Sequence, residues 1–321
     1  MTARTMVSIL ALVGAFSGNA LGQAFPNRPL TMVVASAAGS PMDLLARTVQ
    51  PELTATLGQQ IVIDLKPGAS GKVGLTALLR APRDGYTFAT LTWTHLVTLP
   101  FTEKDLGFDV DKDFTLFTNG IGAPAGLAVH SSVPVKTLKE FVALAKQQGE
   151  KLNYGTFGTG SSVHFATEAM FARFGVKLTH VPYKSEALSM PDLATGRLQV
   201  MMVSGAVAPH LDSGAVRLIA TTGESRWQRF PEVQTIKEQG FDYSWVPWLG
   251  FGAAAGIPEE ARTRITAALV AALRSENVRQ TFRKVGYDAI PSTPEAFAAV
   301  AKSDRAMVEA TMKTGRIKLT D

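Results

Sequence analysis

Two stretches of this 321-residue chain share one pattern and decide its fold: MVVASAAGSPMDLLAR, residues 32–47, and LNYGTFGTGSSVHFAT, residues 152–167. Each runs from a strand through a turn of small residues into a helix. A helix start presents unpaired backbone N–H groups and the positive end of the helix dipole, so each turn is suited to hold an anion. The pattern predicts one such turn in each half of the molecule.

The second stretch is close to a phosphate-binding loop, with one difference. Gly155 is followed by four residues, then by Gly160 and the pair Ser161-Ser162, but a serine stands where that loop carries lysine. Without the lysine, and with no nearby Asp at a strand end to help hold magnesium, nucleotide binding is disfavoured and a smaller anion such as a carboxylate remains. A tight turn capped by Ser161 or Ser162 would explain the same residues without any ligand.

Strands and helices alternate on both sides of the two stretches. We expect strands at 30–35, 60–65, 87–91, 151–155, 177–183, 198–203 and 216–221, and helices at 41–57, 71–80, 138–148, 162–174, 187–195, 258–274, 278–285 and 294–314. The alternation predicts an α/β fold with mostly parallel sheets and helices on both faces. Ligands of such sheets bind beyond the carboxyl ends of the strands, where both turns lie. Two facing lobes would enclose a molecule with an anionic group at one or both ends.

The first 24 residues predict a secretory signal. Arg4 precedes an apolar run from Met6 to Phe16, and small residues with candidate cleavage sites follow it. The run is shorter than the roughly 20 residues needed to span a bilayer, so we expect a protein outside the cytoplasm. Cleavage after Ala24 leaves roughly 297 residues, enough for two lobes of ordinary size.

The composition excludes several classes of function. The chain has no cysteine, which rules out thiolate catalysis and Cys-zinc sites. Its 32 Lys and Arg residues exceed its 27 Asp and Glu residues only slightly and are scattered, so nucleic acid is not an expected partner. The five histidines form no HExxH motif or pair at ligand spacing, and no G-x-S-x-G elbow is present. We therefore expect no enzyme, no catalytic residue, no metal and no cofactor.

Six segments, in order and spacing, resemble the Bug proteins, the extracytoplasmic solute receptors of tripartite tricarboxylate transporters. They are MVVASAAGSPMDLLAR, KPGASGKVG, APRDGYT, LNYGTFGTGSSVHFA, HVPYK and SWVPWLGFGAAAGIP, and they span nearly the whole mature chain. The resemblance implies a two-lobed periplasmic-binding-protein fold, type II-like, with the ligand in the cleft between the lobes and no catalysis. The expected division is a signal peptide at 1–24, lobe 1 at 25–125 and 250–321, and lobe 2 at 126–249.

The resemblance also implies a function and its partners. A receptor of this kind captures a small organic carboxylate in the periplasm and delivers it to the permease subunits of a membrane transporter. A receptor of the same fold that reports to a sensor kinase, with signalling as its output, is the alternative. The sequence does not separate the two.

The candidate site residues lie mainly in the two turns, and the resemblance implies those from Ser36 to Asp43 and from Gly158 to His164. The first turn contributes Ser36, Ala37, Ala38, Gly39, Ser40 and Asp43, and the second contributes Phe157, Gly158, Thr159, Gly160, Ser161, Ser162 and His164, with Lys72, Trp93, Thr94, Tyr183 and Ser204 as further candidates. Asp43 has the alternative role of stabilising the helix start. For His164 the alternative is a structural hydrogen bond, and for Tyr183 it is packing.

Departures from the family pattern bear on the ligand. Pro41 suits the first helical position but removes one N–H that an anion would use. Lys72 replaces an asparagine, and its charge either stays solvated or compensates for that lost donor. Met42, Trp93 and Phe157 are bulkier than is usual, which favours an aromatic or otherwise bulky carboxylate unless the three pack against each other.

Overall fold

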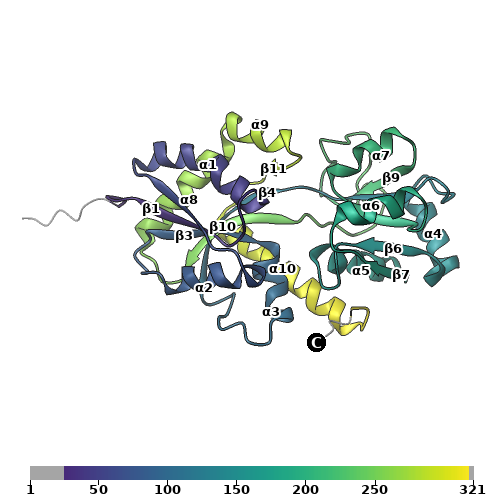
Figure 1. The fold of residues 1–321 in the computed structure, drawn as a ribbon, viewed down its shortest axis with the longest axis horizontal. Coiled ribbons are helices and arrows are strands. Elements are labelled where there is room, and N and C mark those ends of the chain that lie inside the picture. The colour runs from purple at the N-terminus through teal and green to yellow at the C-terminus, as the bar shows by residue number, and fades with distance from the viewer. Residues whose placement is uncertain (1–24, 318–321) are drawn as a thin grey trace, which may run out of the picture.

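The computed structural model describes residues 25–317, so the predicted signal segment lies outside the described residues. Two lobes lie side by side, each with one β-sheet and helices packed against it (Figure 1). The lobe that contains Leu30 is called lobe 1, and the other is called lobe 2. This arrangement is the α/β, two-lobed fold that the sequence predicts.

Lobe 1 combines the two ends of the chain. Its strands are β1 (Leu30–Val34), β2 (Ile61–Leu65), β3 (Thr87–Thr92), β4 (Phe114–Gly122), β10 (Trp248–Ala254) and β11 (Asp288–Ala289). Its helices are α1 (Pro41–Leu57), α2 (Lys72–Arg80), α3 (Leu99–Thr102), α8 (Glu259–Arg274), α9 (Glu276–Lys284) and α10 (Pro294–Lys313). The strand order is β11-β4-β10-β3-β1-β2, so a late strand, β10, lies between two early ones.

Lobe 2 is built from one continuous stretch of chain. Its strands are β5 (Gly126–His130), β6 (Asn153–Thr156), β7 (Thr179–Pro182), β8 (Val200–Val203) and β9 (Val216–Thr221). Its helices are α4 (Leu138–Gln148), α5 (Ser162–Phe174), α6 (Glu186–Ala194) and α7 (Ala208–Asp212). The strand order is β7-β6-β8-β5-β9.

The two sheets are mixed, which corrects the expectation of mostly parallel sheets. Strand β1 pairs in parallel with β2 and β3, and β6 pairs in parallel with β7 and β8, but every pair that contains β4, β5 or β10 is antiparallel. The reason is the passage of the chain between the lobes. Strands β5 and β10 carry the chain into a lobe and therefore run away from the other lobe. Strands β1 and β6, which precede the two candidate turns, run toward the other lobe.

Helix α1 shows how local sequence builds these elements. Ser40 caps its start, and Gly58 ends it with the left-handed φ of 67° that favours glycine. Leu45, Val49 and Leu53 recur at helical spacing and are fully buried against the lobe 1 sheet. Burying each such side chain contributes about 1.5–3 kcal/mol, so the apolar face fixes the helix on the sheet.

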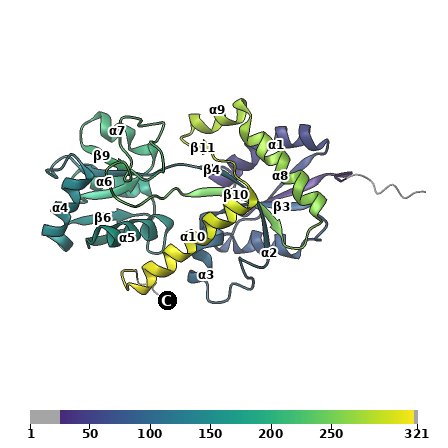
Figure 2. The ribbon, with the colours of Figure 1, turned by 180° about the vertical axis from the view of Figure 1, so that it is seen from behind.

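Helix α10 links the two lobes, and it runs obliquely from lobe 1 to α5 in both views (Figures 1 and 2). In lobe 1 the Asp304 carboxylate accepts hydrogen bonds from the indole N–H groups of Trp93, at 2.9 Å, and Trp248, at 2.8 Å. Just after the helix, Arg316 Nη1 lies 3.2 Å from Glu168 Oε2 of α5. Phe165 of α5 packs into the same core cluster as Trp93. The lobes therefore share a core as well as two crossing segments.

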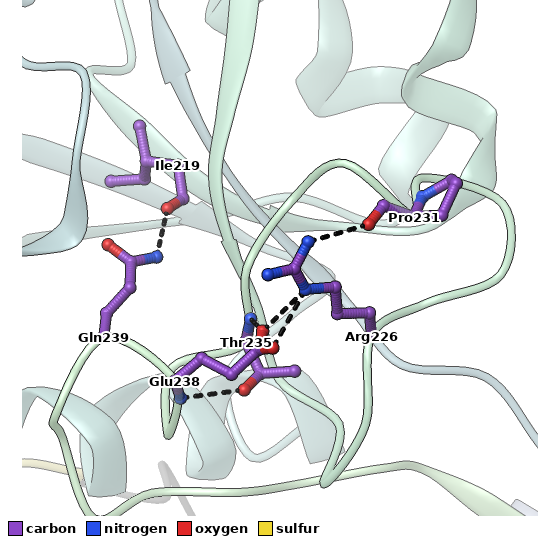
Figure 3. Close-up of polar contacts among 6 residues, drawn as sticks. All are labelled: Ile219, Arg226, Pro231, Thr235, Glu238 and Gln239. Atoms are coloured by element: carbon purple, nitrogen blue, oxygen red, sulfur yellow. Dashed lines mark hydrogen bonds and ion pairs between the residues drawn. The ribbon is translucent and has the colours of Figure 1, made fainter.

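The long segment between β9 and β10 is held by polar contacts (Figure 3). Arg226 Nε lies 2.9 Å from both carboxylate oxygens of Glu238, and Glu238 Oε2 also accepts the Thr235 N–H at 2.8 Å. Gln239 Nε2 donates to the Ile219 carbonyl of β9 at 2.7 Å. These contacts fix a segment without regular structure beside the second crossing of the chain.

Candidate functional site

Both candidate turns follow the carboxyl ends of strands, on the side of each sheet that faces the other lobe. Strand β4 leaves lobe 1 at Gly122, and β3 and β1 run in the same direction as β4 because β10 is antiparallel to both β3 and β4. Strand β5 enters lobe 2 at Gly126, so β8 and β6, which run opposite to β5, end on the side of lobe 1. The starts of α1 and α5 are therefore directed toward each other's lobe.

At the start of α1, Asp43 and Ser40 form a reciprocal cap. The Ser40 hydroxyl accepts the Asp43 N–H at 3.2 Å, and Asp43 Oδ2 accepts the Gly39 N–H at 2.8 Å. The second carboxylate oxygen pairs with Arg47 Nε at 2.8 Å. Asp43 is only 4% exposed, so its carboxylate is used inside lobe 1 and stabilises the helix start.

The start of α5 repeats this geometry with different residues. The Ser161 hydroxyl accepts the His164 N–H at 3.2 Å, and His164 Nδ1 accepts the Gly160 N–H at 3.1 Å. The φ angle is 77° at Gly39 and 78° at Gly160. The capping serines also agree, with φ and ψ of −71° and 161° at Ser40 and of −67° and 159° at Ser161. The similarity between the two stretches of sequence is thus a similarity of backbone.

The two caps differ in charge. Burial raises the pKa of Asp43, but the hydrogen bond from Gly39 and the contact with Arg47 outweigh it and hold the pKa below its usual value, so the side chain is an anion. Burial, with a smaller effect of His180, lowers the pKa of His164 to about 3, so this side chain is neutral. The start of α5 therefore carries no negative charge of its own.

His164 is held in place by a second histidine. The ring of His180 stacks on it with 3.8 Å between the centroids and 15° between the planes. His180 Nε2 lies 2.6 Å from the Thr156 hydroxyl at the end of β6, and burial lowers the pKa of His180 to about 4. The neutral pair fixes the turn between Thr156 and Gly160 without adding charge to it.

Lys72 begins α2 next to a loop with left-handed backbone. Residues 68–71 have φ angles of 130°, 46°, 52° and 97°. A Cβ atom on Gly71 would lie 2.1 Å from His95 Nε2, so only glycine fits there. The Lys72 ammonium donates to the Asp105 carbonyl of lobe 1. Its charge is thereby tied to a neighbouring loop of the same lobe.

The three bulky residues lie in separate cores and do not pack against each other. Met42 is 5% exposed in the cluster under α1, because the second helical position points inward with Leu45 and Val49. Trp93 is 2% exposed and packs edge to face on Trp245, with 6.2 Å between the ring centroids. Phe157 is half-buried and packs against both core clusters of lobe 2.

The remaining candidates lie at ends of strands. Thr94 is half-buried and begins a π-helical turn, Thr94–Thr98, after β3. Tyr183 follows β7, and its hydroxyl donates to Asp192 Oδ2 at 2.7 Å; burial and Asp192 raise its pKa to about 12. Ser204 follows β8 and is exposed, and its N–H donates to Glu186 Oε1 at 2.7 Å. Contact of these side chains with a ligand stays a prediction.

A pocket of about 320 Å³ lies between the lobes beside the crossing segments, away from both turns. Arg279, Arg283 and Asp288 line it from lobe 1, and Glu224 and Gln228 line it from lobe 2. It sits at the β11 and β9 edges of the two sheets, whereas the turns follow β1 and β6. No sequence pattern predicts this pocket, because its charged residues come singly from distant segments.

Neither a metal centre nor a membrane span is found in the part of the chain that the structure describes. Among residues 25–317, no three His, Asp or Glu side chains are grouped so that they could hold a metal ion. None of the helices in that range has the length and apolar character needed to cross a bilayer.

Comparison with known proteins agrees with the fold. Residues 45–313 match the family model "Tripartite tricarboxylate transporter family receptor". The UPF0065 protein in the gbd 5′ region of Cupriavidus necator is 30% identical over 301 residues, which cover 92% of this chain and 91% of that protein. A TctC solute-binding protein from Polaromonas superposes with a TM-score of 0.82 at 29% identity and 90% and 99% coverage.

A second solved structure is an R. palustris protein with adipate, at a TM-score of 0.71, 32% identity, and 91% and 99% coverage. These likenesses span nearly the whole described chain, so the two-lobed fold is that of periplasmic solute-binding proteins. The chain belongs to the tripartite tricarboxylate transporter receptor family, the Bug proteins, whose members are solute-binding receptors rather than enzymes.

Proposed function

We propose that this protein is a periplasmic receptor that captures a small organic acid and delivers it to the permease of a tripartite tricarboxylate-type transporter. Three observations support the proposal. The family is one of solute receptors, a relative of the same fold holds the dicarboxylic acid adipate, and two matched helix starts are directed across the lobe junction. The apolar N-terminal run supports export to the periplasm.

The carboxylate of the ligand is proposed to bind at the start of α5. There the Ser162 N–H and hydroxyl have no partner among residues 25–317. The neighbouring His164 is neutral, so nothing in the cap repels an anion. Hydrogen bonds between a carboxylate and such donors contribute about 1.5–3 kcal/mol each. This free donor pair is the observation that carries the proposal.

The body of the acid is proposed to be apolar, on the evidence of Phe157. This side chain follows β6 directly and is half-buried beside the α5 start. Met42 and Trp93 no longer support a bulky ligand, since both side chains are used inside packed cores. A thermal-shift screen of acids with and without an apolar body tests this part of the proposal.

The test of the α5 site is a change of Ser161 to Asp. Aspartate caps a helix as serine does, so folding should be kept, but its charge would lie where the carboxylate binds. We expect Ser161→Asp to weaken acid binding by about a hundredfold or more and Ser161→Ala by only a fewfold. Isothermal titration of the acids that raise the melting temperature provides the measurement.

Thr137→Asp is the matched control, because the Thr137 hydroxyl caps α4 by accepting the N–H of the residue three positions on, as the Ser161 hydroxyl does for α5, and α4 lies on the outer side of lobe 2 (Figure 1). It should leave binding unchanged. Normal binding by a folded Ser161→Asp protein would show that the acid binds elsewhere. Delivery to a permease is tested separately by co-purification with its membrane subunits. Co-purification with a sensor kinase instead would show that the function of the receptor is signalling rather than uptake.

A further inference from the structure

We propose that the receptor recognises its acid at one end only, with the carboxylate at the α5 start and an uncharged end toward α1, and that Pro41 is the residue that sets this preference. The inference rests on the proposed function and names the class of acid. It predicts a monocarboxylate rather than a dicarboxylate.

The argument begins with the first helical residue of each matched turn. The Gly-Ser backbones agree within a few degrees, so Pro41 of α1 and Ser162 of α5 occupy equivalent positions. Ser162 offers an N–H and a hydroxyl, both without a partner in the described chain. Pro41 has neither group. The α1 start thus lacks the two donors that make the α5 start suitable for a carboxylate.

The third helical residue adds a difference in charge. Asp43 is a buried anion at the α1 start, whereas the equivalent His164 is neutral. Arg47 offsets part of the Asp43 charge, but its side chain is 56% exposed and lies one turn further along the helix. A second carboxylate beside α1 would approach a like charge and lose water without gaining the first-turn donor.

Pairs of acids with the same length test the inference directly. We would compare butyrate with succinate, hexanoate with adipate, and 4-methylbenzoate with terephthalate, by titration calorimetry and thermal shift. We expect the best monocarboxylate to bind at least as tightly as its paired dicarboxylate. A dicarboxylate that binds tenfold tighter than its partner would overturn one-ended recognition and leave the proposed receptor function intact. Failure of every acid to bind would overturn both.

Reciprocal variants test the role of Pro41. Pro41→Ser restores the N–H and the hydroxyl at α1 and should tighten dicarboxylate binding about tenfold relative to the paired monocarboxylate. Ser162→Pro makes the opposite change, and the Ser161 backbone already has the extended conformation that precedes Pro41. It should weaken both acids about tenfold to a hundredfold.

Ser162→Ala removes the hydroxyl but keeps the N–H, and it serves if Ser162→Pro does not fold. It should weaken both acids about fivefold to tenfold. An unchanged ratio of the two affinities in Pro41→Ser, or unchanged affinity in Ser162→Ala and Ser162→Pro, would overturn the assignment.

Discussion

Three histidines are held neutral by the fold: His95, His164 and His180. Burial lowers the pKa of His95 to about 4, and the pKa values of the other two are lowered in the same direction. Below the ordinary histidine pKa of about 6.5, the unfolded chain binds protons at these positions that the native protein does not. The free energy of unfolding should therefore fall as the pH drops from about 6.5 toward 4. Asp304, whose pKa burial raises to about 6, opposes this partly, since its stabilisation is lost as the pH rises through 6.

Replacing His95 tests this dependence on pH. Its Nδ1 has no hydrogen-bond partner among the described residues, so His95→Leu removes a titrating group without breaking a hydrogen bond at that nitrogen. Between pH 6.5 and 5, the slope of unfolding free energy against pH should become shallower by about 1 kcal/mol per pH unit. Urea unfolding at several pH values measures it. His210→Asn is the control, because His210 is not one of the three buried histidines. Equal slopes for His95→Leu and the unchanged protein would contradict the prediction.

At the scale of residues, the sequence predicted local contacts and missed distant ones. The Ser161 and His164 cap follows from spacing along one helix, and the role of Asp43 in stabilising a helix start was one of its two expected alternatives. Asp304 had no such signal, because its partners Trp93 and Trp248 are 211 and 56 residues away. The ligand contacts of the site residues stay predictions until the acids are tested.

Helix α10 stabilises the lobe junction through a buried ion pair just beyond its end. The side chains of Arg316 and Glu168 are 18% and 5% exposed, and Glu168 also accepts the Tyr154 hydroxyl. An ion pair in this setting adds little net stability, but removing one partner leaves the other charge buried alone. Moving Arg316 away from α5 would leave the Glu168 carboxylate buried without a counter-charge, so the ion pair keeps this end of the described chain on α5.

Arg316→Met should lower the free energy of unfolding by about 3–5 kcal/mol, since Glu168 would lose its counter-charge. Adding Glu168→Gln should recover much of the loss. Chemical unfolding monitored by circular dichroism measures both variants. Arg173→Met is the control for an exposed pair with Asp242, at 60% and 91% exposure, and should cost about 1 kcal/mol or less. Similar losses for Arg316→Met and Arg173→Met would contradict the prediction.

At the scale of elements, periodicity predicted helices better than strand direction. Helices α1, α4 and α5 have the predicted bounds, because caps and apolar spacing are written into each segment. Strand β4 was not predicted, since Thr118, Asn119 and Gly120 interrupt its apolar pattern where the chain approaches the junction. Strands β5 and β10 were not predicted either. The antiparallel direction of β10 depends on a crossing between lobes, which no local pattern encodes.

At the scale of the whole molecule, the tryptophans report on the junction. Trp93 and Trp245 meet edge to face there, and Trp248 shares Asp304 with Trp93, whereas Trp227 packs on Phe230 inside lobe 2. Rotation of the lobes around a bound acid would alter the contact between Trp93 and Trp245. Closure should therefore be visible in intrinsic fluorescence.

Saturation with an acid that raises the melting temperature should change the tryptophan emission. Trp245→Phe should remove most of the change, because it removes one partner of the junction pair. Trp227→Phe should preserve the change, because that ring lies in the core of lobe 2. A fluorescence titration of the three proteins provides the measurement. Emission that stays constant at saturation would mean that the lobes do not move at this contact.

The place of β10 between β3 and β4 also determines the order in which the two lobes can complete their sheets during synthesis. While the ribosome is still making the segment before Trp248, β3 and β4 have no partner between them, and their bare edges can pair with other chains. The strands from Gly126 to Thr221 need nothing from later in the chain to complete their sheet. The second lobe can thus be finished early, whereas the first remains open until the last quarter of the polypeptide arrives, and a nascent chain stalled in between is the form most exposed to aggregation.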